Sequence, residues 1–134
     1  MKNIIVWNKG NFGTGNYYRY KYELCLFGLK GDRKLNSHNV ADVIEADGTG
    51  NKLHPTQKPT SLIKTFVEQS TRGGEVVFDP FMGSGTVGEV CKKMNRDFIG
   101  CEISKEYFEI AENRIVNGVC QLPAEKFVNN SLLF

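Results

Sequence analysis

The sequence predicts a single α/β domain with a parallel sheet, and three observations support this class. The chain has 134 residues, the size of one compact domain. Hydrophobic residues make up 40% and charged residues 24% of it, as in ordinary globular proteins. Between residues 54 and 118, helix-like and strand-like patterns alternate, which is typical of a parallel sheet with helices packed on it.

Composition also narrows the setting in which the protein works. No apolar run approaches the roughly 18 residues that span a bilayer, and no signal-peptide pattern argues for export, so we expect no membrane partner. The net charge of +2 neither demands nor excludes a polyanionic partner. The four cysteines form no C-x-x-C pair and have no histidine at ligand spacing, so we expect no metal and a reducing, cytoplasmic location.

Two strand patterns come first in the chain. Residues 3–8 contain a β-branched and aromatic run, and residues 22–27 form a second such segment. The intervening residues 8–16 hold three glycines and three asparagines, which favour turns. We therefore predict a β-hairpin region over residues 3–29.

A polar region separates this hairpin from the first helix. Residues 30–53 are predicted to be mostly loop, with at most a short strand at residues 40–44. After Pro59 the apolar period becomes helical, and Gly73-Gly74 provides a stop. The apolar face of this helix consists of Leu62, Ile63, Phe66 and Val67.

The C-terminal half continues as strand, helix, strand and helix. Residues 75–79 and 98–103 are predicted to be buried strands, each followed by a helix with apolar residues at helical spacing. Ser104 is a suitable N-cap for the last helix, which Asn117-Gly118 should end. The tail beyond is weakly patterned. These elements form one predicted unit over residues 54–118, within a single domain spanning residues 1–134.

The most informative segment is the glycine-rich turn after residues 75–79. A strand ends at Asp79 and a helix begins at Thr86, so the backbone turns sharply at the carboxyl end of a strand, where α/β sheets bind ligands. Glu102 follows Asp79 by 23 positions, at the end of the next strand. A carboxylate there can accept the hydroxyl hydrogens of a ribose.

Three interpretations of this turn remain open. Residues 83–88 match G-x-G-x-x-G, the fingerprint of dinucleotide-binding oxidoreductases, but Asp79 would place a negative charge near the bound phosphates. An acidic residue at the strand end better suits a cationic ligand such as S-adenosylmethionine. The third interpretation is a purely structural turn.

A second motif, His54-Pro55-Thr56-Gln57-Lys58-Pro59, directly precedes the first helix. Its prolines set a rigid lead-in and place Thr56 and Lys58 at a helix N-terminus, which suits a carboxylate ligand. The alternative is a proline-punctuated loop with a surface histidine.

Taken together, the two motifs and the later segment Phe98-Ile99-Gly100-Cys101-Glu102-Ile103 resemble the amino-type DNA methyltransferases. These are the adenine-N6 and cytosine-N4 enzymes in the order with the catalytic motif first and the cofactor motif last. The resemblance covers roughly residues 3–117. It implies the Rossmann-like fold of S-adenosylmethionine-dependent methyltransferases, double-stranded DNA as partner, and a role in DNA methylation such as restriction-modification.

The resemblance also implies a role for each matching residue. The cofactor turn, which would surround the methionine part of the cofactor, consists of Asp79, Phe81, Gly83, Gly85 and Thr86. Glu102 would bind the ribose, and the segment that closes over the methionine end would use His54, Thr56 and Lys58.

The catalytic tetrapeptide of that family, Asp- or Asn-Pro-Pro-Tyr or -Phe, is absent. The chain has prolines only at 55, 59, 80 and 123, and Asp79-Pro80-Phe81 belongs to the cofactor turn. We therefore expect a partial sheet that lacks the central catalytic strands, and no catalytic residue in this chain. An upstream fragment of the same enzyme, or a second copy, would have to supply them; the chain would otherwise be a non-catalytic binding module.

The likeness to DNA enzymes draws attention to residues 9–34, which carry six basic side chains and four tyrosines. Basic groups neutralise phosphates and aromatic rings stack on bases. The candidate DNA-binding residues are Lys9, Arg19 and Lys21. The alternative is a solvated hairpin whose tyrosines pack on the core.

Overall fold

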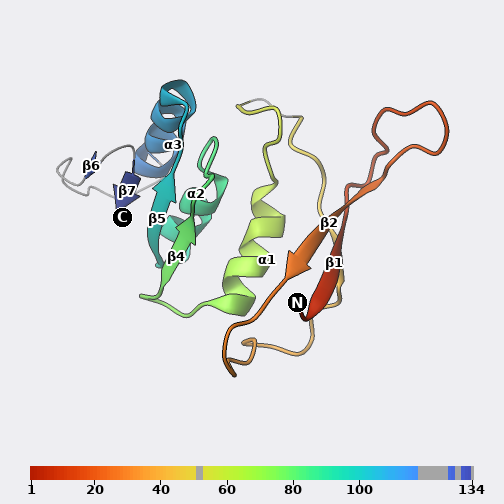
Figure 1. Cartoon of the computed structure of the whole chain (residues 1–134), viewed down its shortest axis with the longest axis horizontal. Helices are drawn as coiled ribbons and strands as arrows, with labels where there is room; N and C mark the ends of the chain where they lie inside the picture. The colour runs from red at the N-terminus through yellow and green to blue at the C-terminus, as the bar shows by residue number, and fades with distance from the viewer. Residues whose placement is uncertain (51–52, 118–126, 129–130, 134) are drawn as a thin grey trace.

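The computed structural model describes residues 1–50, 53–117, 127–128 and 131–133 (Figure 1). Its elements, in chain order, are β1 (Asn3–Asn8), β2 (Tyr22–Phe27), β3 (Val43–Glu45), α1 (Thr60–Ser70), β4 (Val76–Asp79), α2 (Thr86–Lys93), β5 (Asp97–Cys101), α3 (Lys105–Asn117), β6 (Phe127–Val128) and β7 (Ser131–Leu133). Among the described residues, no helix combines the length and the apolar character needed to cross a membrane. The predicted Gly118 stop and Cys120 lie outside these residues.

The strands form two separate sheets. The first has the order β2-β1-β3, in which β1 pairs antiparallel with β2 and parallel with β3. The second has the order β4-β5-β7-β6, and β4 and β5 pair in parallel, as the alternation of elements predicts. β7 joins β5 in the antiparallel direction, so the tail contributes a strand pair that its weak pattern did not predict.

Helix α1 packs against both halves of the molecule (Figure 1). Leu62 is buried in one cluster with Trp7 and Ala46, against which Phe66 also packs. The next residue after each of these helix residues, Ile63 and Val67, faces the second cluster: Val67 is buried in it and Ile63 packs against it. The 3.6-residue period therefore gives α1 two adjoining apolar stripes, one for each sheet.

The second cluster packs the three helices α1, α2 and α3 against the second sheet. It consists of Val67, Met82, Val90, Cys91, Phe98, Phe108, Ala111 and Ile115. Residues of α2 and α3 therefore pack with Phe98 of β5 on one face of the second sheet. This arrangement is the helix-on-sheet packing expected for an α/β domain.

The prediction that β4 is a buried strand is wrong for one of its faces. Val77 packs against the core, but Val76 is 56% and Phe78 60% exposed. The period of two places Val77 on one face of the sheet and both Val76 and Phe78 on the other, and the described residues cover only the face of Val77. Within the described part of the chain β4 pairs with β5 alone, so the Rossmann-like sheet is partial, as predicted.

Candidate cofactor site

A hollow of about 160 Å³ lies at the carboxyl end of β4. Its lining includes seven of the nine predicted cofactor residues, which come from two separate segments of the chain: His54, Thr56, Lys58, Asp79, Phe81, Gly83 and Thr86. The other two predicted residues, Gly85 and Glu102, do not line the hollow but hold its turn in place. Two motifs recognised separately in the sequence therefore meet at one place.

The turn requires glycine at two positions. Gly83 has φ +51° and Gly85 has φ +78°, a left-handed region that other residues rarely adopt. A Cβ on Gly85 would also lie 2.9 Å from both Cα and Cβ of Ala111 in α3. Gly85 thus brings the start of α2 directly against α3, and α2 begins without a side-chain cap.

Glu102 fastens the end of β5 to this turn. One carboxylate oxygen accepts a hydrogen bond from the Gly83 N–H at 2.9 Å, and the other accepts one from the Ser104 N–H at 2.9 Å. A carboxylate oxygen has a second lone pair, so both oxygens retain capacity for a ligand hydroxyl. The sequence suggested only the ribose role; the structure adds a direct contact with the turn.

Asp79 is the acidic residue inside the hollow. Its carboxylate accepts a hydrogen bond from the Phe81 N–H at 3.0 Å. Burial raises the pKa of Asp79, and the charge of Glu102 raises it further, while the Phe81 hydrogen bond acts in the opposite direction. Asp79 is partly desolvated and lies near a second carboxylate, Glu102. A cationic ligand would offset both effects, so this position favours a cation.

The segment that contains His54 lies against the glycine turn. The His54 ring contacts the Tyr107 ring edge-to-face, with 4.3 Å between ring centroids. A Cβ on Gly83 would lie 3.5 Å from Cδ2 of His54, so the ring also packs on the turn. Nδ1 of His54 is 3.2 Å from the Thr56 N–H that donates to it. His54 is therefore a packed part of the site, and Tyr107, placed by the sequence on the apolar face of a helix, belongs to it too.

Lys58 has a partner that the sequence did not reveal. Its ammonium donates to Glu23 at 3.0 Å and lies 5.5 Å from the centroid of the Trp7 ring. Lys9 also pairs with Glu23, at 3.3 Å. Burial would raise the pKa of Glu23, but the hydrogen bonds and charges of Lys58 and Lys9 outweigh it and lower that pKa. Lys58 therefore lines the hollow as one member of an ion pair with Glu23, and its positive charge is partly neutralised there.

Arg114 of α3 is a second residue that sequence reasoning missed. Its guanidinium donates to Glu89 at 2.6 Å, to the Ser84 carbonyl at 3.1 Å and to the Thr86 hydroxyl at 2.9 Å. The side chains of Arg114 and Glu89 are only 14% and 15% exposed. One mostly buried cation therefore joins α3, the start of α2 and the turn.

The candidate DNA-binding residues lie in or beside the loop between β1 and β2. Arg19 donates through Nε to the Gly13 carbonyl at 2.7 Å and stacks on Phe12 at 4.6 Å. Lys9 is held by Glu23, as described above. Tyr17 and Tyr18 are each 96% exposed, so the alternative in which the tyrosines pack on the core is wrong for these two.

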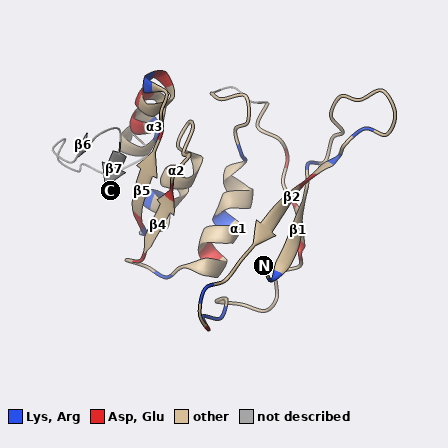
Figure 2. Ribbon diagram, viewed as in Figure 1, with Lys and Arg blue, Asp and Glu red and all other residues tan. Residues whose placement is uncertain are grey.

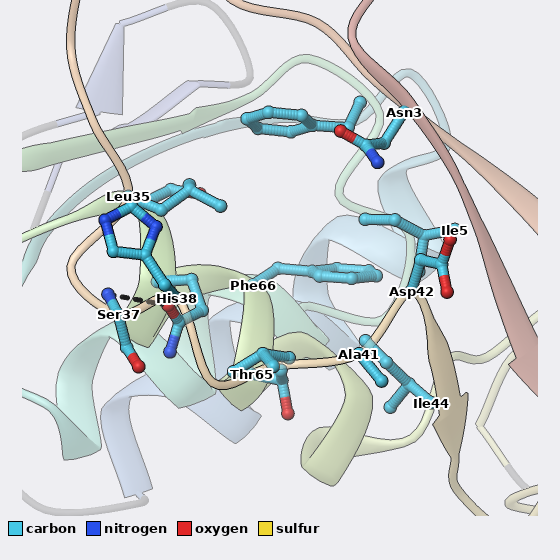
Figure 3. A pocket seen from close by; sticks show the side chains of 14 residues that line it. Asn3, Ile5, Leu35, Ser37, His38, Ala41, Asp42, Ile44, Thr65 and Phe66 are labelled. Atoms are coloured by element: carbon cyan, nitrogen blue, oxygen red, sulfur yellow. Dashed lines mark hydrogen bonds between the residues drawn. The ribbon is translucent and has the colours of Figure 1, made fainter.

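A larger hollow, of about 210 Å³, lies beside the C-terminal end of α1 (Figure 3). Phe66, Ile5 and Ile44 give it apolar walls, and His38 and Leu35 lie at its rim. It contains none of the nine predicted cofactor residues and no glycine turn. Size alone therefore does not locate the site in this molecule.

Comparison with known proteins identifies the family of this chain. The DNA methylase family N6_N4_Mtase matches residues 1–113. The chain is 32% identical to the type II methyltransferase M2.DpnII of Streptococcus pneumoniae over 84% of its own length and 50% of that protein. It is 30% identical to M2.LlaDCHI of Lactococcus lactis subsp. cremoris, covering 87% of this chain and 51% of that protein.

A solved structure is similar as well. The crystal structure of the M1.HpyAVI–SAM complex superposes with a TM-score of 0.72 at 33% identity, covering 86% of this chain and 62% of that one. The chain spans about half the length of the curated relatives it matches. The match of sequence and fold over most of the chain shows that it belongs to the N6_N4_Mtase family of DNA methylases.

Proposed function

We propose that this chain binds S-adenosylmethionine and is the cofactor-binding portion of a DNA methyltransferase that modifies adenine N6 or cytosine N4. The observation that carries the proposal is the meeting of His54, Asp79 and Gly83, from two motifs, at one hollow beside the carboxyl end of β4. Support also comes from membership of the DNA methylase family and from the similar protein solved as a complex with this cofactor.

The residues of the hollow and of the turn beside it fit the chemistry of this cofactor, whose sulfonium supplies the methyl group. Asp79 provides negative charge for the sulfonium or the amino group of its methionine part. Glu102, with free lone pairs on both oxygens, accepts the ribose hydroxyls while holding the turn. The Gly83–Gly85 turn lets the backbone approach the ligand closely, and the His54 ring, packed on that turn, positions the closing segment.

The raised pKa of Asp79 leads to a prediction about pH. A cation binds the ionised carboxylate, so affinity for S-adenosylmethionine is full above the pKa of Asp79 and falls as the pH drops through it. Because that pKa is raised, we expect the loss to begin above the range near pH 4 of an ordinary aspartate. Calorimetry across pH should also detect protons released on binding.

Two variants test the assignment of this titration. Asp79→Asn should weaken binding about tenfold at neutral pH and make the remaining affinity nearly independent of pH, as one lost charge contact of about 1.4 kcal/mol would do. Asp97 is an exposed residue at the start of β5, at the end of that strand away from Glu102. Asp97→Asn should therefore change neither the affinity nor its dependence on pH. An unchanged pH profile in Asp79→Asn would show that Asp79 does not contact the cation.

Methyl transfer requires parts that these 134 residues do not contain. The target base must leave the helix and stack on an aromatic ring, with acceptors that orient its amine. The sequence has no Pro-Pro pair for the tetrapeptide that supplies these groups in the family. We propose that a segment bearing it, in the same polypeptide or a separate one, completes the enzyme beside β4, where Val76 and Phe78 are exposed.

A transfer assay on duplex DNA tests this completion. The 134-residue chain alone should give no methyl transfer above background. Adding a polypeptide that corresponds to the unmatched half of M2.DpnII should restore transfer, and Val76→Asp/Phe78→Asp should abolish the restoration without weakening cofactor binding. Transfer by the chain alone would contradict the proposal.

The second candidate function is a module that binds the cofactor or DNA without turnover, and the absent tetrapeptide is the observation that favours it. Cofactor binding with no restoration by any complementing segment would support it. A dinucleotide-binding oxidoreductase is disfavoured by the carboxylate of Asp79 in the hollow, and calorimetry with NAD should give no binding. The cytoplasm, where DNA and a reducing environment coexist, is the proposed location, and double-stranded DNA the proposed partner.

A further inference from the structure

The loop between β1 and β2 is built to present two bare aromatic rings. Tyr17 and Tyr18 are 96% exposed, far more than aromatic residues in monomeric proteins usually are. Such rings lose favourable burial unless something stacks on them. The exposure is greatest away from the strands, since Tyr20, nearer β2, is 68% exposed and Tyr22, the first residue of β2, is 49% exposed.

The base of this loop is held by backbone and side-chain contacts. The Lys9 N–H donates to the Lys21 carbonyl at 2.8 Å, and the Gly13 N–H donates to the Tyr20 carbonyl at 2.8 Å. Arg19 closes the tip through the Gly13 carbonyl and lies over the Phe12 ring. The two tyrosines therefore stand on a closed support instead of a free chain.

The charge of the loop selects the partner. Residues 9–22 contain Lys9, Arg19 and Lys21 and no aspartate or glutamate, so the loop has a net positive charge, located near its two ends (Figure 2). Cations beside exposed aromatic rings match a polyanion with flat, stackable groups, which describes nucleic acid. Because Lys9 is paired with Glu23, the available charge lies with Arg19 and Lys21.

The position of the loop matches the proposed cofactor site. Lys9, where the loop leaves β1, and Lys58, in the lining of the hollow, both bind Glu23. The Ala46 N–H bonds to the Asn8 carbonyl at 3.1 Å, so the segment that leads from β3 to the hollow starts beside the same loop. In Figure 1 the loop projects at the upper right, and β4, on the other side of α1, also points upward.

We propose that Tyr17 and Tyr18 stack on DNA bases, while Arg19 and Lys21 neutralise the adjoining phosphates. This inference rests on the proposed DNA methyltransferase function and adds a specific contact to it. The rings would occupy an opened base step next to the place where the reacting base approaches the cofactor. A base must be unstacked for its amine to reach the methyl group, and a stacking ring compensates part of that cost.

The test is a titration of the chain with a duplex that carries an unpaired 2-aminopurine. Tyr17→Ala/Tyr18→Ala should weaken binding roughly 5- to 100-fold, while Tyr17→Phe/Tyr18→Phe, which keeps both rings, should bind like the unaltered protein. The unaltered protein should quench the 2-aminopurine fluorescence, and the alanine variant should not. Leu26→Ala, which removes an exposed apolar side chain from β2, controls for a general loss of apolar surface.

Salt dependence separates the rings from the cations. The alanine variant should keep the slope of log affinity against log salt, because tyrosine neutralises no phosphate. Arg19→Ala and Lys21→Ala should each reduce that slope by about one. All variants should bind S-adenosylmethionine normally, since these residues lie outside the hollow.

Several results would overturn the proposal. These are equal affinity of the alanine variant and the unaltered protein, equal losses in the alanine and phenylalanine variants, or an absence of DNA binding when the cofactor still binds. If the alanine variant bound DNA like the unaltered protein but lost binding to anionic phosphatidylglycerol vesicles, the rings would be assigned to a membrane surface. Failure to bind S-adenosylmethionine, in contrast, would refute the proposed function.

Discussion

Gly85→Ala is expected to disrupt the glycine turn and abolish S-adenosylmethionine binding. Alanine would have to adopt φ +78°, and its Cβ would lie 2.9 Å from Cα and Cβ of Ala111. The left-handed backbone and the overpacking against α3 together should lower the free energy of unfolding by on the order of 4 kcal/mol. Urea unfolding measures the loss of stability, and calorimetry measures the loss of binding.

Gly74→Ala provides a matched control for this variant. Gly74 also has a positive φ, +76°, but no atom lies within 4 Å of a Cβ built there. It should show the conformational strain of about 1 kcal/mol without the clash, and cofactor affinity should stay unchanged. Equal destabilisation in the two variants would mean that the contact between Gly85 and Ala111 does not limit the turn.

Arg114→Ala is expected to have the second large effect. It would remove four hydrogen bonds, to Glu89, Ser84 and Thr86, and would leave the mostly buried Glu89 with the exposed Lys93 as its remaining salt-bridge partner among the described residues. Because Lys93 still neutralises Glu89, the loss of these charged hydrogen bonds should lower the free energy of unfolding by on the order of 2 kcal/mol. Because Ser84 and Thr86 form the turn and the start of α2, the affinity for S-adenosylmethionine should also fall, by tenfold or more. Thermal unfolding and calorimetry measure the two effects.

Lys93→Ala is the corresponding control, because Lys93 also pairs with Glu89 but is 57% exposed. It should lower stability by less than about 1 kcal/mol and leave cofactor affinity unchanged. Arg114→Lys keeps the charge but loses the planar set of donors, so it should recover part of the stability and little of the affinity. Full recovery of both by lysine would show that charge alone, and not the geometry of the guanidinium, organises the turn.

The core of the candidate site was predictable because its determinants are local. Glycines that need a positive φ, an acidic residue at a strand end and a helix start all appear within residues 79–86. The pairing of β4 with β5 followed from the alternation of strand and helix patterns. Local patterns do not specify the contact between this turn and the segment around His54. That the segment belongs to the same site was predicted only from the resemblance to the methyltransferase family.

The parts that sequence reasoning missed depend on contacts between distant residues. Glu23 binds Lys58 across 35 positions, and Arg114 binds Glu89 across 25, so no periodic pattern reveals either pair. The exposed side of β4 was predicted to be buried because an apolar run shows hydrophobicity but not which strands cover it. The strands at residues 127–133 were missed because each is only two or three residues long.

The most direct test is an NMR titration of ¹⁵N-labelled protein with S-adenosylmethionine. If the two motifs form the cofactor site, the backbone amides of Gly83, Gly85 and Glu102 should shift, together with those near His54. The amides around Phe66 and His38, which line the larger hollow, should remain unchanged. Shifts confined to that hollow, or no shifts at millimolar cofactor, would contradict the account.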